Sequence, residues 1–482
     1  KRRDTMLITK DEFKIEYGKA VSEGYGAVFA GAGLSKSAGF INWKELVAPF
    51  AKALSLNVEK ESDLIGLTQF YKNEKGNRSD INQRILNSFL SDESLNDNIR
   101  IITRLPISTY WTTNYDELIE EGLKENNRRA DVKISPDTLS INIVDRDAIV
   151  YKMHGDVRTP SEAVLTKDDY ETYNQKRKLF TTALQGDLVS KTFLFIGFSF
   201  EDPNLDYILG RIRVLLGESV RNHYCFLEKV NIENYETDEV EKFNRDSVMQ
   251  ELKIRDLQRY GIQTILLDSY SEITGLLLDI EREYFNKSVF ISGSISDYND
   301  IWTEQKVNQF CFSLSKKLTK KNYRIISGFG LGVGSNVING ALDEVYSSKY
   351  KKISEHLVLR PFPQIETEEI SILDQWERYR QDMIGESGIC IFIFGNKKKG
   401  LDTVPADGMI KEFRISQDKG KIVIPVGATG EVSLTLMNEI EANIEKYPYL
   451  VKHIKDLKNP EIDSNILVDI IVKIVDEVQT FL

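Results

Sequence analysis

The sequence predicts an α/β protein with two domains, each a parallel sheet covered by helices, and three observations carry this prediction. Short β-branched and aromatic runs alternate with helical stretches along the chain, as in parallel sheets with helices on both faces. The 482 residues suffice for two domains of ~100 to 200 residues each. The alternation restarts with a new strand near residue 288, directly after a long helix. We therefore expect one domain at 1–285 and a second at 286–482.

The first domain contains six expected strands and one helical insert. The strands are Ala27–Ala30, Thr109–Thr113, Ile149–Met153, Phe193–Phe198, Tyr224–Leu227 and Thr264–Leu267. The insert is the region Trp43–Leu105, which interrupts the simple alternation. The segment Val230–Asp246 is rich in Glu, Asp and Asn and lacks apolar periodicity, so we expect a surface excursion there.

The second domain follows a helix expected at Ser271–Phe285 and repeats the alternation. Its expected strands each leave at a Gly, Pro or Asn, and they are Ser288–Ser292, Arg324–Ser327, Leu357–Arg360, Ile389–Phe394 and Ile422–Val426.

Composition argues against several classes of function. The formal net charge is −11, so no global basic field is present to attract phosphate backbones, and nucleic acid is not expected as the main partner. The three cysteines, Cys225, Cys311 and Cys390, have no CxxC spacing, which argues against a disulfide framework or a zinc ribbon. No apolar run approaches the ~18 to 20 residues of a membrane span. We expect a cytoplasmic protein without a metal and without a membrane partner.

A glycine-containing motif follows the first expected strand and runs Gly31, Ala32, Gly33, Leu34, Ser35. Small residues at the carboxyl end of a strand allow the backbone to approach a pyrophosphate, whose charge is met by amide groups at the next helix start. A tight turn that requires glycine is the alternative interpretation.

Three further polar motifs stand at strand ends. Asn114 and Asp116 follow the second strand, where they could face a ligand crevice or simply cap a helix. His154 follows the third strand, although a lone histidine is more often structural than catalytic. The fourth motif begins at Gly197, and within it Asp202 and Pro203 suit the start of a helix. Because these strand ends meet at one sheet edge, the four motifs together predict a single crevice.

Taken together, these motifs resemble the NAD-binding domain of the sirtuin family over roughly residues 10 to 285. The resemblance implies that the glycine motif holds the pyrophosphate and nicotinamide ribose, that Asn114 and Asp116 line the nicotinamide pocket, and that His154 acts as a base. It implies that Gly197 and Ser199 contact the adenosine half. The remaining residues expected to bind NAD are Gly155, Asp202 and Asn204.

One departure from the sirtuin pattern bears on the reaction. Deacylating sirtuins carry a zinc-bound cysteine tetrad after the His-Gly segment, whereas Gly155–Lys191 contains no cysteine. This puts the acyl-lysine groove in doubt and favours water as the acceptor, giving hydrolysis of NAD⁺ to nicotinamide and ADP-ribose. The alternatives are an NAD-dependent protein deacylase and a non-catalytic NAD-binding sensor.

The second domain carries its own glycine-rich loop. Four glycines alternate along Gly328–Gly334 between an expected strand and a helix, which suits a phosphate cradle, while a flexible turn is the alternative. Arg360, Arg380 and Lys397 lie at or near strand ends, where they could neutralise an anion or remain solvated surface cations.

This half resembles the SLOG family, a Rossmann-like group whose members bind or process nucleotide-derived ligands. A sirtuin-like domain followed by a SLOG domain resembles the effectors of the Thoeris anti-phage system, which act in abortive-infection defence. The resemblance implies activation by a cyclic ADP-ribose isomer that a TIR-domain protein makes, and a homo-oligomer, either a tetramer or a filament. The expected activator contacts are Gly293, Ser294, Gly330, Leu331, Gly332, Arg360, Arg380, Lys397 and Glu412.

Overall fold

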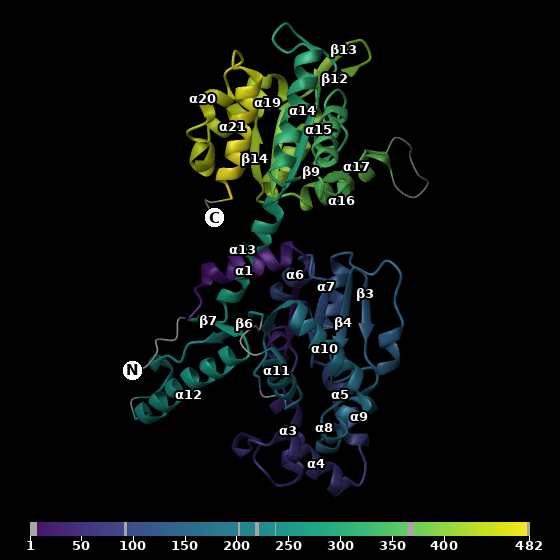
Figure 1. Ribbon diagram of the computed structural model, residues 1–482, viewed down its shortest axis with the longest axis vertical. Helices are drawn as coiled ribbons and strands as arrows, with labels where there is room; N and C mark the ends of the chain where they lie inside the picture. The colour runs from purple at the N-terminus through teal and green to yellow at the C-terminus, as the bar shows by residue number, and fades with distance from the viewer. Residues whose placement is uncertain are drawn as a thin grey trace. The chain divides into compact units, whose positions relative to one another are not determined.

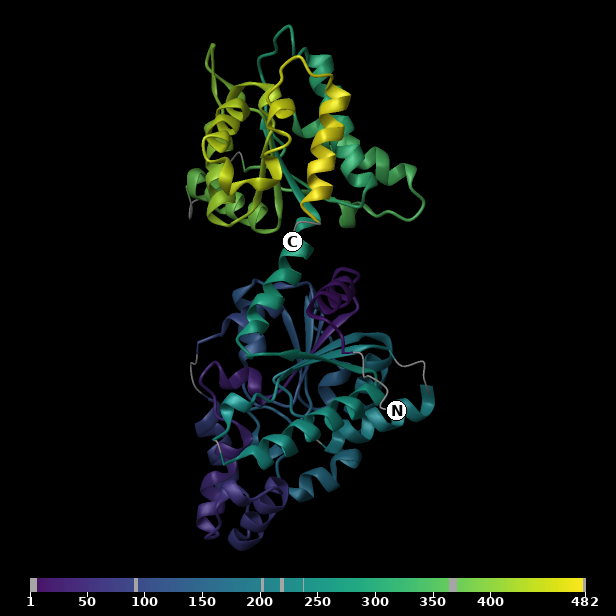
Figure 2. The same ribbon diagram turned by 90° about the vertical axis from the view of Figure 1, so that its left-hand side faces the viewer.

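The computed structural model describes residues 7–90, 94–200, 203–216, 221–236, 238–363 and 371–479. The chain divides into two compact units, Lys1–Glu281 and Arg282–Leu482. Each unit contains a parallel sheet with helices packed around it (Figures 1 and 2). The predicted class, an α/β protein with two Rossmann-like domains, is confirmed. None of the helices in the described ranges has the length and apolar character needed to cross a membrane.

The first unit is built on a seven-stranded sheet in the order β3-β4-β2-β1-β5-β6-β7, with every neighbouring pair parallel. The strands are β1 (Gly26–Ala30), β2 (Thr109–Thr112), β3 (Ala130–Lys133), β4 (Ala148–Lys152), β5 (Thr192–Ile196), β6 (His223–Glu228) and β7 (Ile262–Leu267). All six predicted strands are present, and β3 was missed. The prediction Phe193–Phe198 was too long, because Gly197 adopts a φ of 65° that ends the strand.

Thirteen α-helices accompany this sheet in the described ranges. They are α1 (Lys10–Ser22), α2 (Ala32–Lys36), α3 (Trp43–Ala53), α4 (Leu64–Lys75), α5 (Ser79–Phe89), α6 (Asp97–Arg104), α7 (Leu118–Glu125), α8 (Lys167–Glu171), α9 (Tyr173–Lys176), α10 (Lys178–Ser190), α11 (Pro203–Leu216), α12 (Val240–Arg259) and α13 (Glu272–Asn286), the last of which crosses the division between the units. Helices α3 to α6 form the predicted insert. The excursion predicted for Val230–Asp246 was wrong in its second half, because α12 begins at Val240.

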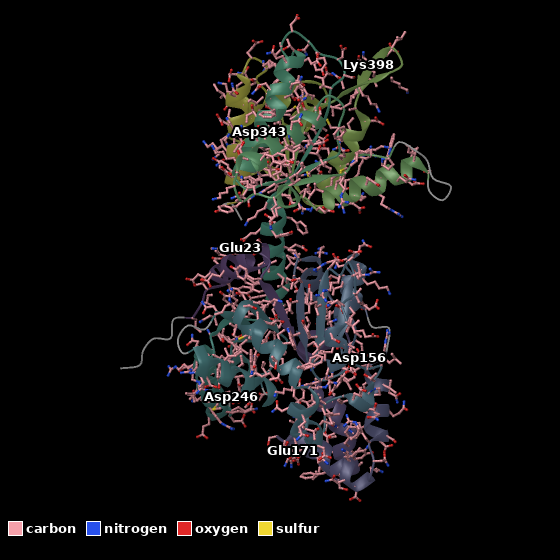
Figure 3. The ribbon with its side chains drawn as sticks, turned by 45° about the vertical axis from the view of Figure 1, so that its right-hand side comes forward. Glu23, Asp156, Glu171, Asp246, Asp343 and Lys398 are labelled. Carbon is pink, nitrogen blue, oxygen red and sulfur yellow. The ribbon has the colours of Figure 1, made fainter. Side chains whose placement is uncertain are left out.

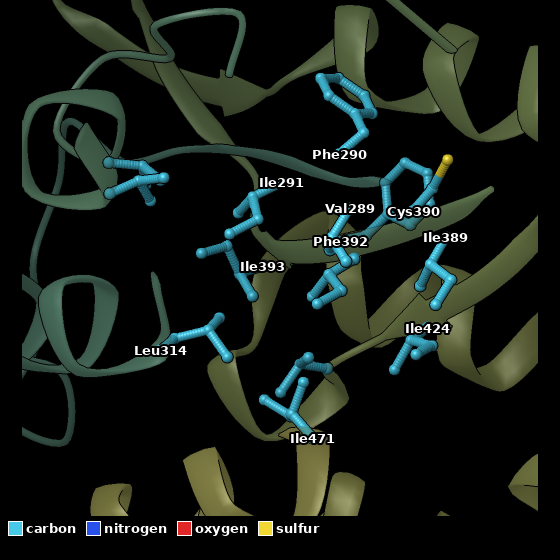
Figure 4. Close-up of a cluster of buried hydrophobic side chains, with 14 of the residues drawn as sticks. Val289, Phe290, Ile291, Leu314, Ile389, Cys390, Phe392, Ile393, Ile424 and Ile471 are labelled. Atoms are coloured by element: carbon cyan, nitrogen blue, oxygen red, sulfur yellow. The ribbon is translucent and has the colours of Figure 1, made fainter. Parts of the chain in front are cut away.

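The second unit is built on a five-stranded parallel sheet in the order β10-β9-β8-β11-β14, with a separate antiparallel hairpin. The strands are β8 (Ser288–Ser294), β9 (Arg324–Ser327), β10 (Leu357–Leu359), β11 (Ile389–Phe394) and β14 (Ile422–Pro425), and the hairpin is β12 (Asn396–Lys399) with β13 (Asp402–Pro405). The helices are α14 (Glu304–Lys320), α15 (Gly334–Ser347), α16 (Ile353–His356), α17 (Ile372–Gly385), α18 (Asp407–Asp418), α19 (Glu431–Glu441), α20 (Ile454–Leu457) and α21 (Ser464–Glu477). Strand β11 is buried along its whole length, and its side chains belong to the hydrophobic core of this unit (Figure 4).

Both sheets contain a point where the chain changes its direction of winding. In the first sheet β1 pairs with β2 on one side and with β5 on the other. In the second sheet β8 pairs with β9 and β11 in the same manner. Open α/β sheets bind ligands at the carboxyl ends of the strands that flank such a point. The fold therefore predicts ligand sites at the loops after β1 and β5, and at those after β8 and β11.

Candidate functional site

A cavity of about 940 Å³ lies at the carboxyl ends of β1 and β5 in the first unit. This volume is in the range of ligand and cofactor pockets, ~300 to 1,000 Å³. Its walls include eight of the predicted residues: Ala32, Gly33, Ser35, Asn114, Asp116, His154, Gly197 and Ser199. Gly31 and Gly155 are not part of these walls. Asp202 and the side chain of Asn204 lie outside the described residues.

The glycines of the first motif bring two loops of the crevice into close contact. The amide of Gly31 donates to the carbonyl of Ile196 at 2.9 Å, and that of Gly33 donates to Gly197 at 2.8 Å. A Cβ on Gly197 would lie 2.1 Å from the amide nitrogen of Leu34, a distance that no side chain tolerates. Glycine is thus required here because the backbones that follow β1 and β5 touch.

Asn114 is held by hydrogen bonds from its side-chain amide. Its Nδ2 donates to the carbonyl of Gly31 at 3.0 Å and to Ser35 Oγ at 2.8 Å. Ser35 Oγ in turn donates to Asp116 Oδ2 at 2.7 Å, and the other carboxylate oxygen accepts the amide of Leu118 at 3.1 Å. Both Nδ2 hydrogens of Asn114 are used in this way. Its carbonyl oxygen therefore remains to accept a hydrogen bond from a ligand hydroxyl or water.

His154 follows β4 and forms another part of the same cavity wall. Its side chain is buried, and its ring meets Tyr170 edge-on at a centroid distance of 5.6 Å and Tyr173 at 6.3 Å. The carbonyl of His154 accepts the amide of Val164 at 2.8 Å. The imidazole therefore packs edge-on against two aromatic rings and forms part of the cavity wall.

Other residues of the cavity wall were not predicted from the sequence. Trp43 and Asn96 come from the helical insert, and Lys253 and Tyr270 come from the end of the first unit. Lys253 donates to the carbonyl of Ser199 at 2.9 Å, which brings a cation to the loop after β5. These residues stand in no motif, so the sequence offered no signal for them. The described part of the chain contains no cluster of three His, Cys, Asp or Glu residues suited to a metal.

The second unit also brings its glycine loop against the end of β8. A Cβ on Gly330 would lie 1.9 Å from the carbonyl oxygen of Gly293. The amide of Ile295 donates to the carbonyl of Leu331 at 2.8 Å, so the two loops are joined by their backbones. Ser294 Oγ donates to the carbonyl of Asn396 at 3.0 Å and so connects them to the loop after β11.

Two of the predicted cations lie near these loops, and each is paired with a carboxylate. Arg380 Nε lies 3.5 Å from Glu412 Oε1, and its guanidinium carbon lies 5.0 Å from the centre of the Phe362 ring. Glu412 also accepts a hydrogen bond from Ser292 Oγ at 2.6 Å. Ser292 is the residue directly before Gly293 in the sequence. Burial raises the pKa of Glu412, against the lowering effect of Ser292 and Arg380.

Lys397, in strand β12 of the hairpin, is paired in an exposed contact with Asp407, the first residue of α18. This hydrogen bond lowers the pKa of Asp407. Lys397 directly follows Asn396, which contacts Ser294, so the cation belongs to the same group of loops.

Arg360 is directed elsewhere. Its guanidinium pairs with Glu386 at 2.5 Å, and Glu386 also lies 4.0 Å from Arg324. Arg324 is the first residue of β9, at the edge of the sheet opposite the glycine loop. The ion pair with Glu386 therefore directs the Arg360 side chain away from the other predicted activator residues.

Comparison with known proteins gives matches for both halves of the chain. A model described as a SIR2-like domain matches residues 108–256, and one described as the Sir2- and TIR-associating SLOG family matches residues 272–478. These matches confirm the sirtuin and SLOG resemblances.

Several curated proteins match nearly the full length. A protein of Cytobacillus dafuensis named "NAD(+) hydrolase ThsA" is 48% identical over 92% of this chain and 90% of its own length. Proteins of the same name from Bacillus cereus (strain MSX-D12) and Acinetobacter baumannii (strain 532279) are 47% and 41% identical. They cover 96% and 89% of this chain, and 97% and 90% of their own lengths are matched.

Proposed function

Because the chain belongs to the ThsA family of NAD(+) hydrolases, we propose that it cleaves NAD⁺ to nicotinamide and ADP-ribose in the cavity of the first unit. One observation carries the proposal: Asn114, Asp116 and His154 come from two separate strand ends and meet on the wall of one cavity of cofactor size. Cavities of this kind at a winding change point bind dinucleotides in other α/β folds.

The proposed binding mode places the adenosine half near Gly197 and Ser199, and the nicotinamide riboside near Asn114 and His154. The half-buried cation of Lys253, which contacts the Ser199 carbonyl, suits the negative charge of the pyrophosphate. The free carbonyl oxygen of Asn114 suits a ribose hydroxyl or the attacking water.

The proposed reaction requires little acid catalysis. Nicotinamide is a pyridinium in NAD⁺ and leaves as a neutral base, so the site must stabilise an oxocarbenium-like ribose instead of protonating the leaving group. The carboxylate of Asp116 contributes negative charge to the cavity wall. His154 deprotonates water or a ribose hydroxyl, a role that typically contributes ~10² to 10⁴ in rate.

The second unit is proposed to bind the activator, a cyclic ADP-ribose isomer supplied by a TIR-domain protein during phage infection. Gly293, Ser294 and the loop Gly330–Gly332 would meet its phosphates, together with Arg380 and Lys397. Both cations are already paired with carboxylates, so the ligand phosphates must compete with Glu412 and Asp407. Activation would deplete cytoplasmic NAD⁺ through a homo-oligomer.

The test follows nicotinamide release from NAD⁺ by the purified chain, with and without each cyclic ADP-ribose isomer. We expect strong stimulation by one isomer, abolished by Arg380→Ala. Absence of nicotinamide release under every condition would reject hydrolysis and favour a binding role. Release of acetyl-ADP-ribose in the presence of an acetyl-lysine peptide would instead identify a deacylase.

A further inference from the structure

A fully buried lysine lies behind the cavity wall and has no part in the proposed reaction. Lys152 is the last residue of β4, and none of its surface is exposed. Its ammonium donates to the carbonyls of Tyr115 at 3.1 Å and Asp116 at 2.6 Å, and to Asp156 Oδ2 at 2.5 Å. Glu120 Oε1 lies 3.3 Å away. Burying a charged ammonium has a large desolvation cost, which packing alone does not offset.

The charges around Lys152 keep the ammonium protonated. Burial by itself lowers the pKa of this lysine, but Glu120 and Asp156 outweigh burial and leave its pKa above the ordinary value. Burial raises the pKa of Glu120, while the nearby ammonium acts to lower it. The charged side chain is therefore maintained inside the protein, where its hydrogen bonds are strong.

These hydrogen bonds join the two segments that carry the predicted catalytic residues. One segment follows β2, and in it Asn114 directly precedes Tyr115 and Asp116, whose carbonyls accept hydrogen bonds from Lys152. The other follows β4 and contains His154, two residues before Asp156, which is labelled in Figure 3. The amide of Val157 also donates to the Tyr115 carbonyl at 3.0 Å, parallel to the lysine contacts.

We propose that Lys152 is a positioning residue that sets the distance between Asn114 and His154, an inference that rests on the proposed NAD⁺ hydrolysis. The ammonium acts on the two segments through the carbonyls of Tyr115 and Asp116 and the carboxylate of Asp156. Its loss would let the two segments move relative to each other, and displacement of a catalytic group by about 1 Å costs about 100-fold in rate.

The same sheet offers a matched control. Lys133 on β3 is also buried, forms an ion pair with Asp131 Oδ1 at 2.8 Å and donates to the carbonyl of Ile141. None of these three residues belongs to the cavity wall. Replacing Lys133 therefore reproduces the loss of a buried lysine without disturbing the proposed site.

The experiment compares Lys152→Met and Lys133→Met in the full chain, well below their melting temperatures, by nicotinamide release and by calorimetric binding of NAD⁺. We expect both variants to melt earlier than the wild type. Lys152→Met should lose about 100-fold in kcat with KM and NAD⁺ affinity within about threefold, while Lys133→Met keeps kcat within about threefold. Lys152→Arg, which retains the charge, should recover part of the lost kcat.

Equal losses of kcat in Lys152→Met and Lys133→Met, or an unchanged kcat in Lys152→Met, would overturn the positioning role. If Lys152→Met does not fold, Asp156→Asn takes its place, because it keeps the shape of the side chain and an oxygen for the amide of Arg158. That variant should lose about tenfold in kcat at constant KM, and an unchanged kcat would again overturn the inference. A wild type that releases no nicotinamide, with or without each cyclic ADP-ribose isomer, would instead reject the proposed function, so the two failures are distinguishable.

Discussion

Removal of the Asn114 side chain tests the proposed chemistry most simply, because the structure separates its structural and catalytic contributions. In Asn114→Ala the hydrogen bonds from Nδ2 to the Gly31 carbonyl and Ser35 Oγ are lost. Each such bond contributes ~0.5 to 1.5 kcal/mol to stability, so the free energy of unfolding should fall by about 2 kcal/mol. The folded state should persist at this cost.

The catalytic loss should be larger than the stability loss. In the proposed binding mode the carbonyl oxygen of Asn114 is a preorganised polar group beside the nicotinamide riboside, and removal of one such group typically costs ~10² to 10³ in kcat. Binding of NAD⁺ should change much less, because the proposed contacts of the adenosine half lie at Gly197 and Ser199.

The assay measures nicotinamide release and NAD⁺ affinity for Asn114→Ala alongside a matched variant, Asn126→Ala. Nδ2 of Asn126 likewise donates to a backbone carbonyl, that of Gly122, and to a hydroxyl, that of Thr103, both at 3.0 Å, and it has a longer contact of 3.2 Å to the carbonyl of Arg100. Asn126 is not part of the cavity wall. Asn126→Ala should lose at least as much stability as Asn114→Ala, while only Asn114→Ala loses kcat. A kcat within threefold of wild type in Asn114→Ala would refute the reasoning.

Three further predictions concern other parts of the chain. Asp407→Asn frees Lys397 and should lower the half-activating concentration of the cyclic ADP-ribose isomer by up to about fivefold, since an exposed ion pair is worth ~0.2 to 1 kcal/mol; weaker activation would contradict this. Gly197→Ala places a Cβ against Leu34 at positive φ and should lower the free energy of unfolding by ~1 to 3 kcal/mol, which thermal and urea unfolding will measure; unchanged stability would contradict the loop contact. Burial lowers the pKa of His223 to about 3, so its contribution to stability is present above pH ~6.5 and is lost as pH falls toward 3, by ~1.4 kcal/mol per pH unit. Urea unfolding of His223→Gln at several pH values should lack this component of the slope, and an identical slope would contradict it.

The sequence predicts best those strands whose buried side chains are apolar. Arg324–Ser327 and Ile389–Phe394 have the predicted bounds because β-branched and aromatic side chains pack on both faces of a central strand. Strand β3 was missed because its buried positions are charged: Asp131 and Lys133 neutralise each other inside the protein. Charged residues in a sequence predict an exposed segment, and only the structure shows that this pair is buried.

The sequence predicts the residues of the cavity wall that lie in motifs directly after strands. It does not predict the wall residues that come from other segments. Asn114 and His154 could be placed together because parallel strands end at one edge. Trp43 reaches the cavity from the helical insert, whose position relative to the sheet depends on packing across many residues. Lys152 lies within a predicted strand, where nothing in the local pattern indicates that its ammonium joins two loops.

The most direct test of the account is a structure of the His154→Ala variant with NAD⁺ bound, in which slow turnover preserves the substrate. The account predicts the anomeric carbon of the nicotinamide ribose between Asn114 and residue 154, with the adenosine beside Gly197 and Ser199. NAD⁺ bound in the reverse orientation, or outside this cavity, would contradict it.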